Sequence, residues 1–176
     1  MVLRRSARRV LVDGVGSGPL ADALVAPLTV GGAGPVRVSA GDFQRPAGER
    51  FAWGREDVQS LRETWLDAAA LEREVLGRGA DYLPALWDAE HDRSARRRRV
   101  PLPPRAVIVV DGALLLGRGL TADLVVHLAL SPAALVRRGV PTWQLPVFAA
   151  YEVEVVDACD ALVRAEDPLR PAVRYP

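Results

Sequence analysis

The chain has 176 residues, 49% of them hydrophobic and 26% charged, a composition typical of one globular domain with a sizeable core and not of a disordered segment. With 23 basic and 22 acidic residues the net charge is +1, which argues against a general binder of nucleic acid or other polyanions. The apolar runs are too short to cross a bilayer, and the single cysteine, Cys159, cannot form an internal disulfide. We therefore expect a soluble cytoplasmic protein with no membrane partner.

The first half of the chain alternates between strand and helix patterns. The β-branched run "RRVLVDG" (8–14) predicts a buried strand, and "GPVRVSAGDF" (34–43) predicts a second one. Between them, "PLADALVAPL" (19–28) has apolar residues at helical spacing, with Pro19 acceptable in the first turn. The longest helical pattern, over 55–76, predicts one long amphipathic helix. Its apolar positions recur at steps of three and four: Val58, Leu61, Trp65, Ala68, Leu71 and Val75.

The second half repeats the alternation. Continuous apolar runs in "AVIVVDGALLL" (106–116) and "ADLVVHLAL" (122–130) predict two further buried strands. A helix is expected to begin near Ser131 as its N-cap, with Pro132 at the first helical position. An amphipathic segment and a last strand, around Ala161 to Val163, complete the pattern.

Strands that alternate with helices predict an α/β fold: a three-layer sandwich with a mainly parallel, five-stranded sheet and the first strand at its centre. We expect a single domain over residues 1–176. In such sheets ligands bind beyond the carboxyl ends of the strands. Gly14 to Gly18, Asp42 and Asp111 are expected there.

The turn after the first strand, "VDGVGSGPL" (12–20), has glycines placed roughly as in a phosphate-binding loop between a strand and a helix. Such a loop uses lysine as a compact point charge on the transferred phosphate. Pro19 occupies that position, and the chain contains no lysine anywhere, so all 23 basic residues are arginines.

Five segments spread over nearly the whole chain share one pattern of motifs: "VLVDGVGSGPLADAL", "VSAGDFQRP", "ALWDAEHD", "VIVVDGALLL" and "DALVRAEDPLRPAVRY". Together they resemble the uridine kinase-like P-loop nucleoside kinases, particularly the actinobacterial type. The first segment stands where that family has a strand, a Walker A loop and its helix, and the last two are similar to its fourth-strand motif and to its C-terminal strand and Asp-Pro turn. "ALWDAEHD" resembles the family's Tyr-Asp or Phe-Asp stretch. The family's Ser-x-Asp-Asp-Phe-His-Arg-Pro segment and its Gly-Arg pair are matched at Ser39, Asp42, Phe43, Arg45, Pro46, Gly54 and Arg55.

The resemblance implies which residues would form a kinase site. It implies substrate-binding roles for Asp42, Phe43, Arg45, Arg55, Trp87 and Asp88. It implies phosphate- or nucleotide-binding roles for Gly14, Gly16, Ser17, Gly18, Arg137 and Arg138. Asp42 and Asp111 are the catalytic candidates. ATP and Mg²⁺ would be cofactors only if the kinase activity survives, and no metal ligand is assigned.

Three parts of the kinase machinery depart from the family pattern. The loop is about three residues shorter by alignment and has neither the lysine nor the following Ser or Thr that would hold Mg²⁺. Gly41 stands where the family has its catalytic base, the first Asp of the Asp-Asp-Phe segment, so only the second, Asp42, remains. The family also has a lid segment that carries several arginines. The matching segment here, 136–156, is shortened, and its only arginines are Arg137 and Arg138. Together these departures favour lost or strongly reduced phosphoryl transfer.

The sequence is compatible with several functions. The protein could bind a nucleoside-like small molecule without phosphorylating it, or act as a scaffold for a protein partner or a second copy of itself. Alternatively, it could be an active nucleoside kinase in which Arg137 or Arg138 supplies the cation. A weaker alternative is a nucleic-acid binder that uses the run Arg96 to Arg99, although no aromatic residues interleave that run.

Single polar residues also have structural interpretations. Ser17 could cap the following helix or hold Mg²⁺, and we favour the cap. Arg55 could pair with Asp42 or Asp88 as a loop tie. His127, inside an apolar run, is expected to be a hydrogen-bonded core histidine, and His91 a residue of a solvated loop.

Overall fold

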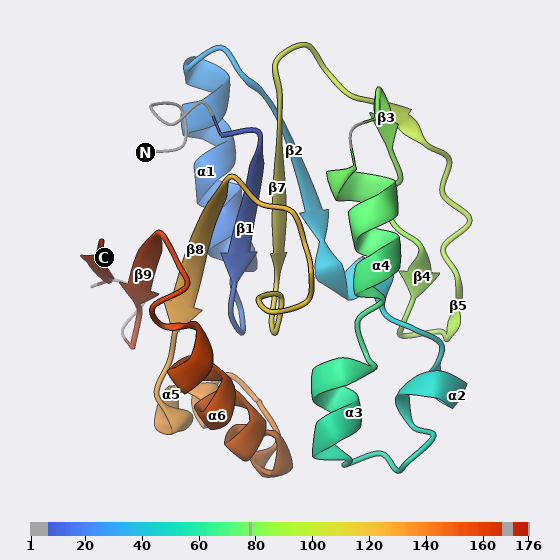
Figure 1. The fold of residues 1–176 in the computed structure, drawn as a ribbon, viewed down its shortest axis with the longest axis vertical. Coiled ribbons are helices and arrows are strands. Elements are labelled where there is room, and N and C mark those ends of the chain that lie inside the picture. Colours follow the sequence, from blue (N-terminus) through green and yellow to red (C-terminus); the bar gives the residue numbers. More distant parts are fainter. Residues whose placement is uncertain (1–6, 78, 167–170, 176) are drawn as a thin grey trace.

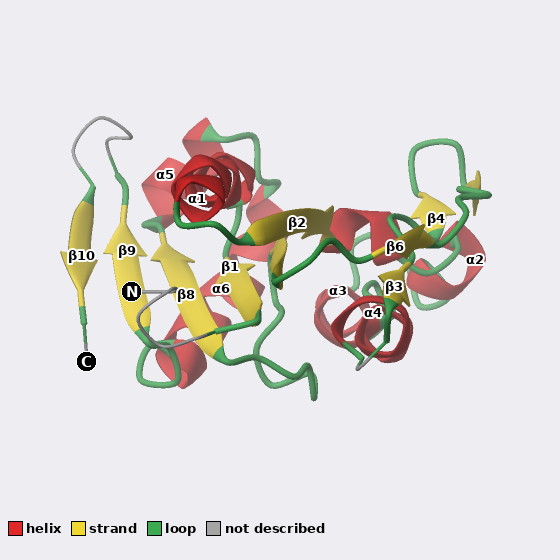
Figure 2. Ribbon diagram, turned by 90° about the horizontal axis from the view of Figure 1, so that it is seen from above, coloured by secondary structure: helices red, strands yellow, loops and turns green. Residues whose placement is uncertain are grey.

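The computed structural model describes residues 7–77, 79–166 and 171–175, which form a six-stranded sheet with helices on both faces (Figures 1 and 2). The strand order is β10-β9-β8-β1-β7-β2, and every neighbouring pair is parallel except β10 with β9. The strands are β1 (Arg9–Asp13), β2 (Gly34–Ser39), β7 (Ala106–Gly112), β8 (Leu124–Ala129), β9 (Ala161–Arg164) and β10 (Ala172–Arg174).

The prediction of a mainly parallel sheet with the first strand inside it is confirmed. The predicted count of five strands was one too low, because the short β10 adds an antiparallel edge strand. Its three residues are all exposed and carry no apolar run that could signal a strand. The Asp167–Pro168 turn implied by the family resemblance lies outside the described residues.

The strand β1 is buried on both faces, as its continuous apolar sequence predicts. Val10 and Val12 pack into the core on the side of α1 (Gly18–Val30), whereas Leu11 packs into the core on the opposite side. Figure 2 shows α1 and α4 (Ala68–Leu71) on opposite sides of the sheet. The parallel strands point to one edge, where α3 (Val58–Glu63), α5 (Pro132–Arg137) and α6 (Leu145–Val155) lie (Figure 1). This is the carboxyl edge expected to hold a ligand.

The predicted long helix over 55–76 is wrong. The chain forms α3, then α4, and then a π-helical turn over Glu72–Leu76. Between α3 and α4 the backbone pairs with an earlier loop instead: Arg45 N–H donates to the Trp65 carbonyl at 2.9 Å, and Asp67 N–H donates to the Phe43 carbonyl at 2.9 Å. Asp67 then caps α4 through its carboxylate. These long-range bonds outweigh the local helical pattern.

The remaining segments are short. The 3₁₀ turn Ala40–Phe43 and α2 (Ala47–Arg50) follow β2, and a second 3₁₀ turn, Thr142–Gln144, precedes α6. Two antiparallel ladders occupy the Arg-rich connection: β3 (Asp81–Tyr82) with β6 (Val100–Pro101), and β4 (Trp87–Asp88) with β5 (Arg93–Ser94). The expected Ser131 cap is confirmed, since its hydroxyl accepts from Ala134 N–H at 3.2 Å. Within the described ranges, no helix is long and apolar enough to cross a membrane.

Candidate functional site

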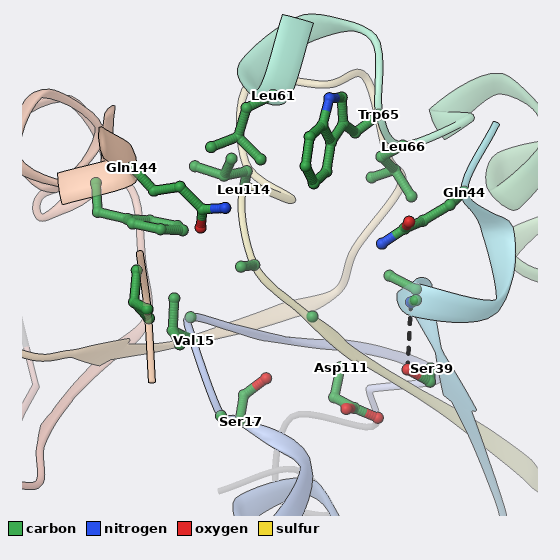
Figure 3. A pocket seen from close by; sticks show the side chains of 18 of the residues that line it. Val15, Ser17, Ser39, Gln44, Leu61, Trp65, Leu66, Asp111, Leu114 and Gln144 are labelled. Atoms are coloured by element: carbon green, nitrogen blue, oxygen red, sulfur yellow. Dashed lines mark hydrogen bonds between the residues drawn. The ribbon is translucent and has the colours of Figure 1, made fainter. Parts of the chain in front are cut away.

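A cleft of about 370 Å³ opens at the carboxyl ends of β1, β2 and β7 (Figure 3). Its floor contains the turn after β1, together with Ser39 and Asp111 at the ends of β2 and β7. Its upper walls are largely apolar and come from α3, α6 and the loops beside them. The lining side chains there include Leu61, Trp65, Leu66, Leu114, Val140 and Phe148.

The turn after β1 places Gly14, Gly16, Ser17 and Gly18 along this cleft, as the sequence predicts. Gly14 has φ +125°, and a Cβ there would lie 2.4 Å from the Leu128 carbonyl oxygen. Its N–H donates to the Gly112 carbonyl at 2.8 Å. Gly14 is therefore required where β1 passes close to β8, whether or not a ligand binds.

Ser17 stands at the N-cap position of α1, but its hydroxyl makes no capping bond. The expected cap is wrong in this respect. The Ser17 Oγ is buried and has no hydrogen-bond partner among the described residues. Figure 3 shows it directed into the cleft, where a ligand could accept from it.

Asp111 is paired by Arg37, which was not among the predicted site residues. Arg37 donates from Nε to Asp111 Oδ1 at 2.9 Å and from Nη2 to Oδ2 at 3.1 Å, and its Nη1 lies 3.1 Å from Asp22 Oδ1. The hydrogen bond to Asp111 raises the pKa of Arg37 despite partial burial. A Cβ at Gly18 would lie 3.0 Å from Arg37 Nη2. The guanidinium thus fills the space beside the first residue of α1.

The two arginines proposed as alternative cations are also engaged. Arg138 donates to the carbonyls of Val15 and Ala165, both at 3.3 Å, so it contacts the loop through a backbone oxygen. Arg137 lies 3.8 Å from Glu166 and does not line this cleft.

The six residues implied as a substrate site are not brought together. Asp42, Trp87 and Asp88 line a second, polar cleft of about 760 Å³, with Arg93, Arg96 and Arg97. This cleft shares Gly41 with the first one. The two catalytic candidates therefore line different clefts, Asp42 the second and Asp111 the first. Burial, and then the charge of Asp111, raise the pKa of Asp42.

The other three of those residues are occupied elsewhere. Phe43 is fully buried in the core, and Arg45 pairs with Glu49 at 3.0 Å. Arg55 lies over the Phe51 ring at 5.1 Å. The loop tie from Arg55 to Asp42 or Asp88 does not occur in the described structure, where His91 and Arg93 bind Asp88 instead.

A buried polar network lies behind the loop. Asp13, which has no exposed surface, accepts from Leu115 N–H at 2.9 Å, from Tyr151 O–H at 3.0 Å and from His127 Nδ1 at 2.6 Å. The His127 Nε2 lies 2.8 Å from Glu152 Oε2. Burial lowers the pKa of His127, but the bonds and charges of Asp13 and Glu152 outweigh it, so the net shift is upward. The expectation of a hydrogen-bonded core histidine is confirmed.

The raised pKa of His127 predicts a pH-dependent stability. A histidine whose folded pKa exceeds its unfolded value of about 6.5 stabilises the protein fully below that pH, and the contribution is lost as pH rises through the folded pKa. We expect the melting temperature to fall as the pH rises above about 6.5, and His127→Gln to flatten this slope. The matched control is His91→Gln, which replaces the exposed histidine and should keep the wild-type slope. Equal slopes in wild type and His127→Gln would contradict this prediction.

Within the described residues, no group of three or more His, Cys, Asp or Glu side chains is arranged to hold a metal ion. His91, Asp88 and Asp92 lie in an exposed turn, where Asp88 accepts from the backbone and ring of His91. Asp92 instead accepts from Ala47 N–H and from Trp87 Nε1.

Comparison with solved structures identifies the architecture. A Bacillus stearothermophilus protein described as a possible uridine kinase superposes with a TM-score of 0.65 at 18% identity, over 88% of this chain and 86% of that one. The fold is that of the P-loop kinases. A Silicibacter sp. TM1040 protein assigned as a fructose transport system kinase has a TM-score of 0.54 at 16% identity, over 90% of this chain and 91% of that one. No protein-family model and no curated protein matches the chain.

Proposed function

We propose that this P-loop kinase-fold protein binds a small nucleoside-like molecule in the cleft over β1, β2 and β7 and does not transfer a phosphoryl group from ATP. The observation that carries the second half of the proposal is the bidentate Arg37–Asp111 pair beside the start of α1. The residues present do not fit MgATP, because the Arg37 guanidinium is already bound to the Asp111 carboxylate and the loop carries no lysine.

The first half of the proposal is supported by the cleft walls. Apolar side chains cover one side, and the carboxamides of Gln44 and Gln144 extend from opposite walls (Figure 3). Few polar groups among apolar and aromatic side chains are typical of a small-molecule site. The family resemblance and the fold of the uridine kinase-like neighbour favour a nucleoside-like ligand. We therefore propose that the ligand binds in the cleft lined by Trp65, and not in the polar cleft of Trp87 and Asp88 that the family resemblance implied.

A second candidate, an active kinase with an atypical loop, is favoured by one observation. The Ser17 hydroxyl is buried, lacks a partner in the described structure and lies at the N-terminus of a 13-residue helix, which is suited to an anion. The two candidates differ in their expected response to MgATP.

We expect calorimetry to detect no MgATP binding at micromolar concentrations. The missing charge-assisted contacts are each worth about 1.5–3 kcal/mol, so their loss weakens binding by several powers of ten. An uncharged nucleoside such as uridine should raise the melting temperature. Micromolar MgATP binding, or turnover of uridine with ATP, would support the active kinase instead.

Three tryptophan variants locate the ligand. Trp65→Ala should abolish the shift caused by the nucleoside, whereas Trp53→Ala, at an indole that is 82% exposed and outside both clefts, should retain it. Loss of the shift in Trp87→Ala alone would place the ligand in the polar cleft. If no nucleoside shifts the melting temperature of the wild type, the binding proposal fails and a scaffold role remains.

A further inference from the structure

Arg50, which is only 7% exposed, contacts both Gln44 and Trp65 on one wall of the ligand cleft. Its Nη1 donates to Gln44 Oε1 at 2.8 Å, and its backbone carbonyl accepts from Trp65 Nε1 at 3.0 Å. The guanidinium carbon also lies over the Phe51 and Trp65 rings, at 4.9 and 5.7 Å. Arg50 itself does not line the cleft.

This contact fixes which end of the Gln44 carboxamide faces the cleft. A guanidinium has only donors, so the atom of Gln44 that it contacts must be the carbonyl oxygen. A flipped amide would place N–H donors against the Arg50 donors in a buried setting and leave both unsatisfied. The Nε2 of Gln44 is therefore the atom presented to the cleft, as Figure 3 shows.

The same residue holds the indole that forms the neighbouring wall. The Trp65 N–H is satisfied by the Arg50 carbonyl, so the indole needs no polar partner from a ligand. Its ring packs edge-to-face against Phe51 and Trp143, with centroids 5.4 and 6.1 Å away. Leu61 and Leu66 line the cleft beside it. A rigid aromatic wall of this kind favours a planar ring.

We propose that Gln44 selects a ring carbonyl over a ring amino group, and that Arg50 is the positioning residue that sets this preference. The inference rests on the proposed function, since it names the ligand class of that same cleft. A keto oxygen accepts from Gln44 Nε2, whereas an amino group in the same place meets donor against donor. Gln144, on the opposite wall, makes no side-chain hydrogen bond to the described residues, so its carboxamide can turn to suit either group.

The lining disfavours a positively charged ring. Asp111, the acidic side chain in the lining of this cleft, is paired by Arg37, and Arg62 is paired by Glu154. Arg118 donates to the carbonyls of Glu63 and Leu66, which are neutral acceptors. A positive ligand charge at Trp65 would be desolvated against apolar walls without a free carboxylate to pair it.

The test compares two matched pairs of probes: uridine with cytidine, and inosine with adenosine. Within each pair a keto oxygen is exchanged for an amino group, and the neighbouring ring nitrogen changes from donor to acceptor. Calorimetry on the wild type should give at least about tenfold tighter binding of the keto member in any pair that binds, because the amino member leaves buried donors unpaired.

Gln44→Glu is the deciding variant. A glutamate keeps the contact to Arg50 as an ion pair but presents only acceptor oxygens to the cleft, so the order of affinities within each pair should reverse. Gln59→Glu makes the same chemical change on α3 outside the cleft and should leave the order unchanged. Arg50→Met removes the constraint on the amide and should reduce the preference to within about threefold, with folding checked by the melting temperature.

The outcomes separate this inference from the function beneath it. Equal binding of keto and amino members by the wild type, or an unchanged order in Gln44→Glu, overturns the carbonyl selection while the ligand-binding function stands. If none of the four probes binds, both proposals fall. Because Gln44→Glu retains the partner of Arg50, it tests the inference even if Arg50→Met fails to fold.

Discussion

Asp13→Ala should lower the free energy of unfolding by about 3–5 kcal/mol, the range expected when one partner of a buried charge pair is removed. Asp13 is fully buried and accepts from a backbone N–H, a phenol and an imidazole. Alanine would leave all three donors without this acceptor. The protonated His127 would then depend on Glu152 alone.

The loss should extend to the turn after β7. The Leu115 N–H is held by Asp13, and the Leu116 N–H by the Tyr151 hydroxyl, which itself donates to Asp13. Leu114 lies in this turn, between the end of β7 and Leu115. It is buried and has φ +61°, a left-handed conformation that a leucine rarely adopts. Because Leu114 also lines the ligand cleft, loosening this turn alters a wall of the site.

Urea denaturation measures the effect, and Asp157→Asn is the control. Asp157 is 92% exposed and lies 3.9 Å from Arg174, so its replacement should change the free energy of unfolding by no more than about 0.5 kcal/mol. Asp13→Asn adds a second readout: without the carboxylate charge, the His127 pKa measured by NMR should fall. An Asp13→Ala protein as stable as the control would show that the network contributes little.

The sheet could be predicted from the sequence because its strands are buried on both faces. β1, β7 and β8 carry continuous apolar runs, which leave a clear signal without any knowledge of the fold. The break between α3 and α4 could not be predicted in the same way. It depends on hydrogen bonds from residues 65 and 67 to residues 43 and 45, and no local pattern encodes that pairing. The local sequence contains one sign of the break: Asp67, a residue type that favours helix N-caps, lies inside the helical pattern.

The candidate site was predicted in part, for a similar reason. The turn after β1 and Asp111 follow buried strands, so the topology alone places them at the carboxyl edge. Gln44 and Gln144 carry no such signal, since an amide gains its role from what holds it: Arg50 in the case of Gln44. Arg37 did leave a signal, as a charged residue within the apolar strand "GPVRVS". Its partner Asp111 lies on the adjacent strand, at a separation that the sequence does not reveal.

The second large effect is expected at that pair. Arg37→Met should lower the free energy of unfolding by about 3 kcal/mol, at the low end of the range for a broken buried pair because the Arg37 side chain is 33% exposed. The reason is the carboxylate of Asp111, 7% exposed, which would lose both of its guanidinium bonds. Asp22, 62% exposed, would lose a surface ion pair of little energetic value.

A double-mutant cycle separates the pair from its surroundings. Asp111→Leu removes the buried charge, so Arg37→Met combined with Asp111→Leu should recover much of the stability lost in Arg37→Met alone, since hydrophobic replacement of a buried ion pair is often neutral or stabilising. Additive losses in the double variant would mean that the two side chains act independently.

The same proteins test the proposed function. If the Arg37–Asp111 pair is what excludes metal-bound phosphate, Arg37→Met should begin to bind Mg²⁺ through the freed Asp111 carboxylate, whereas the double variant should not.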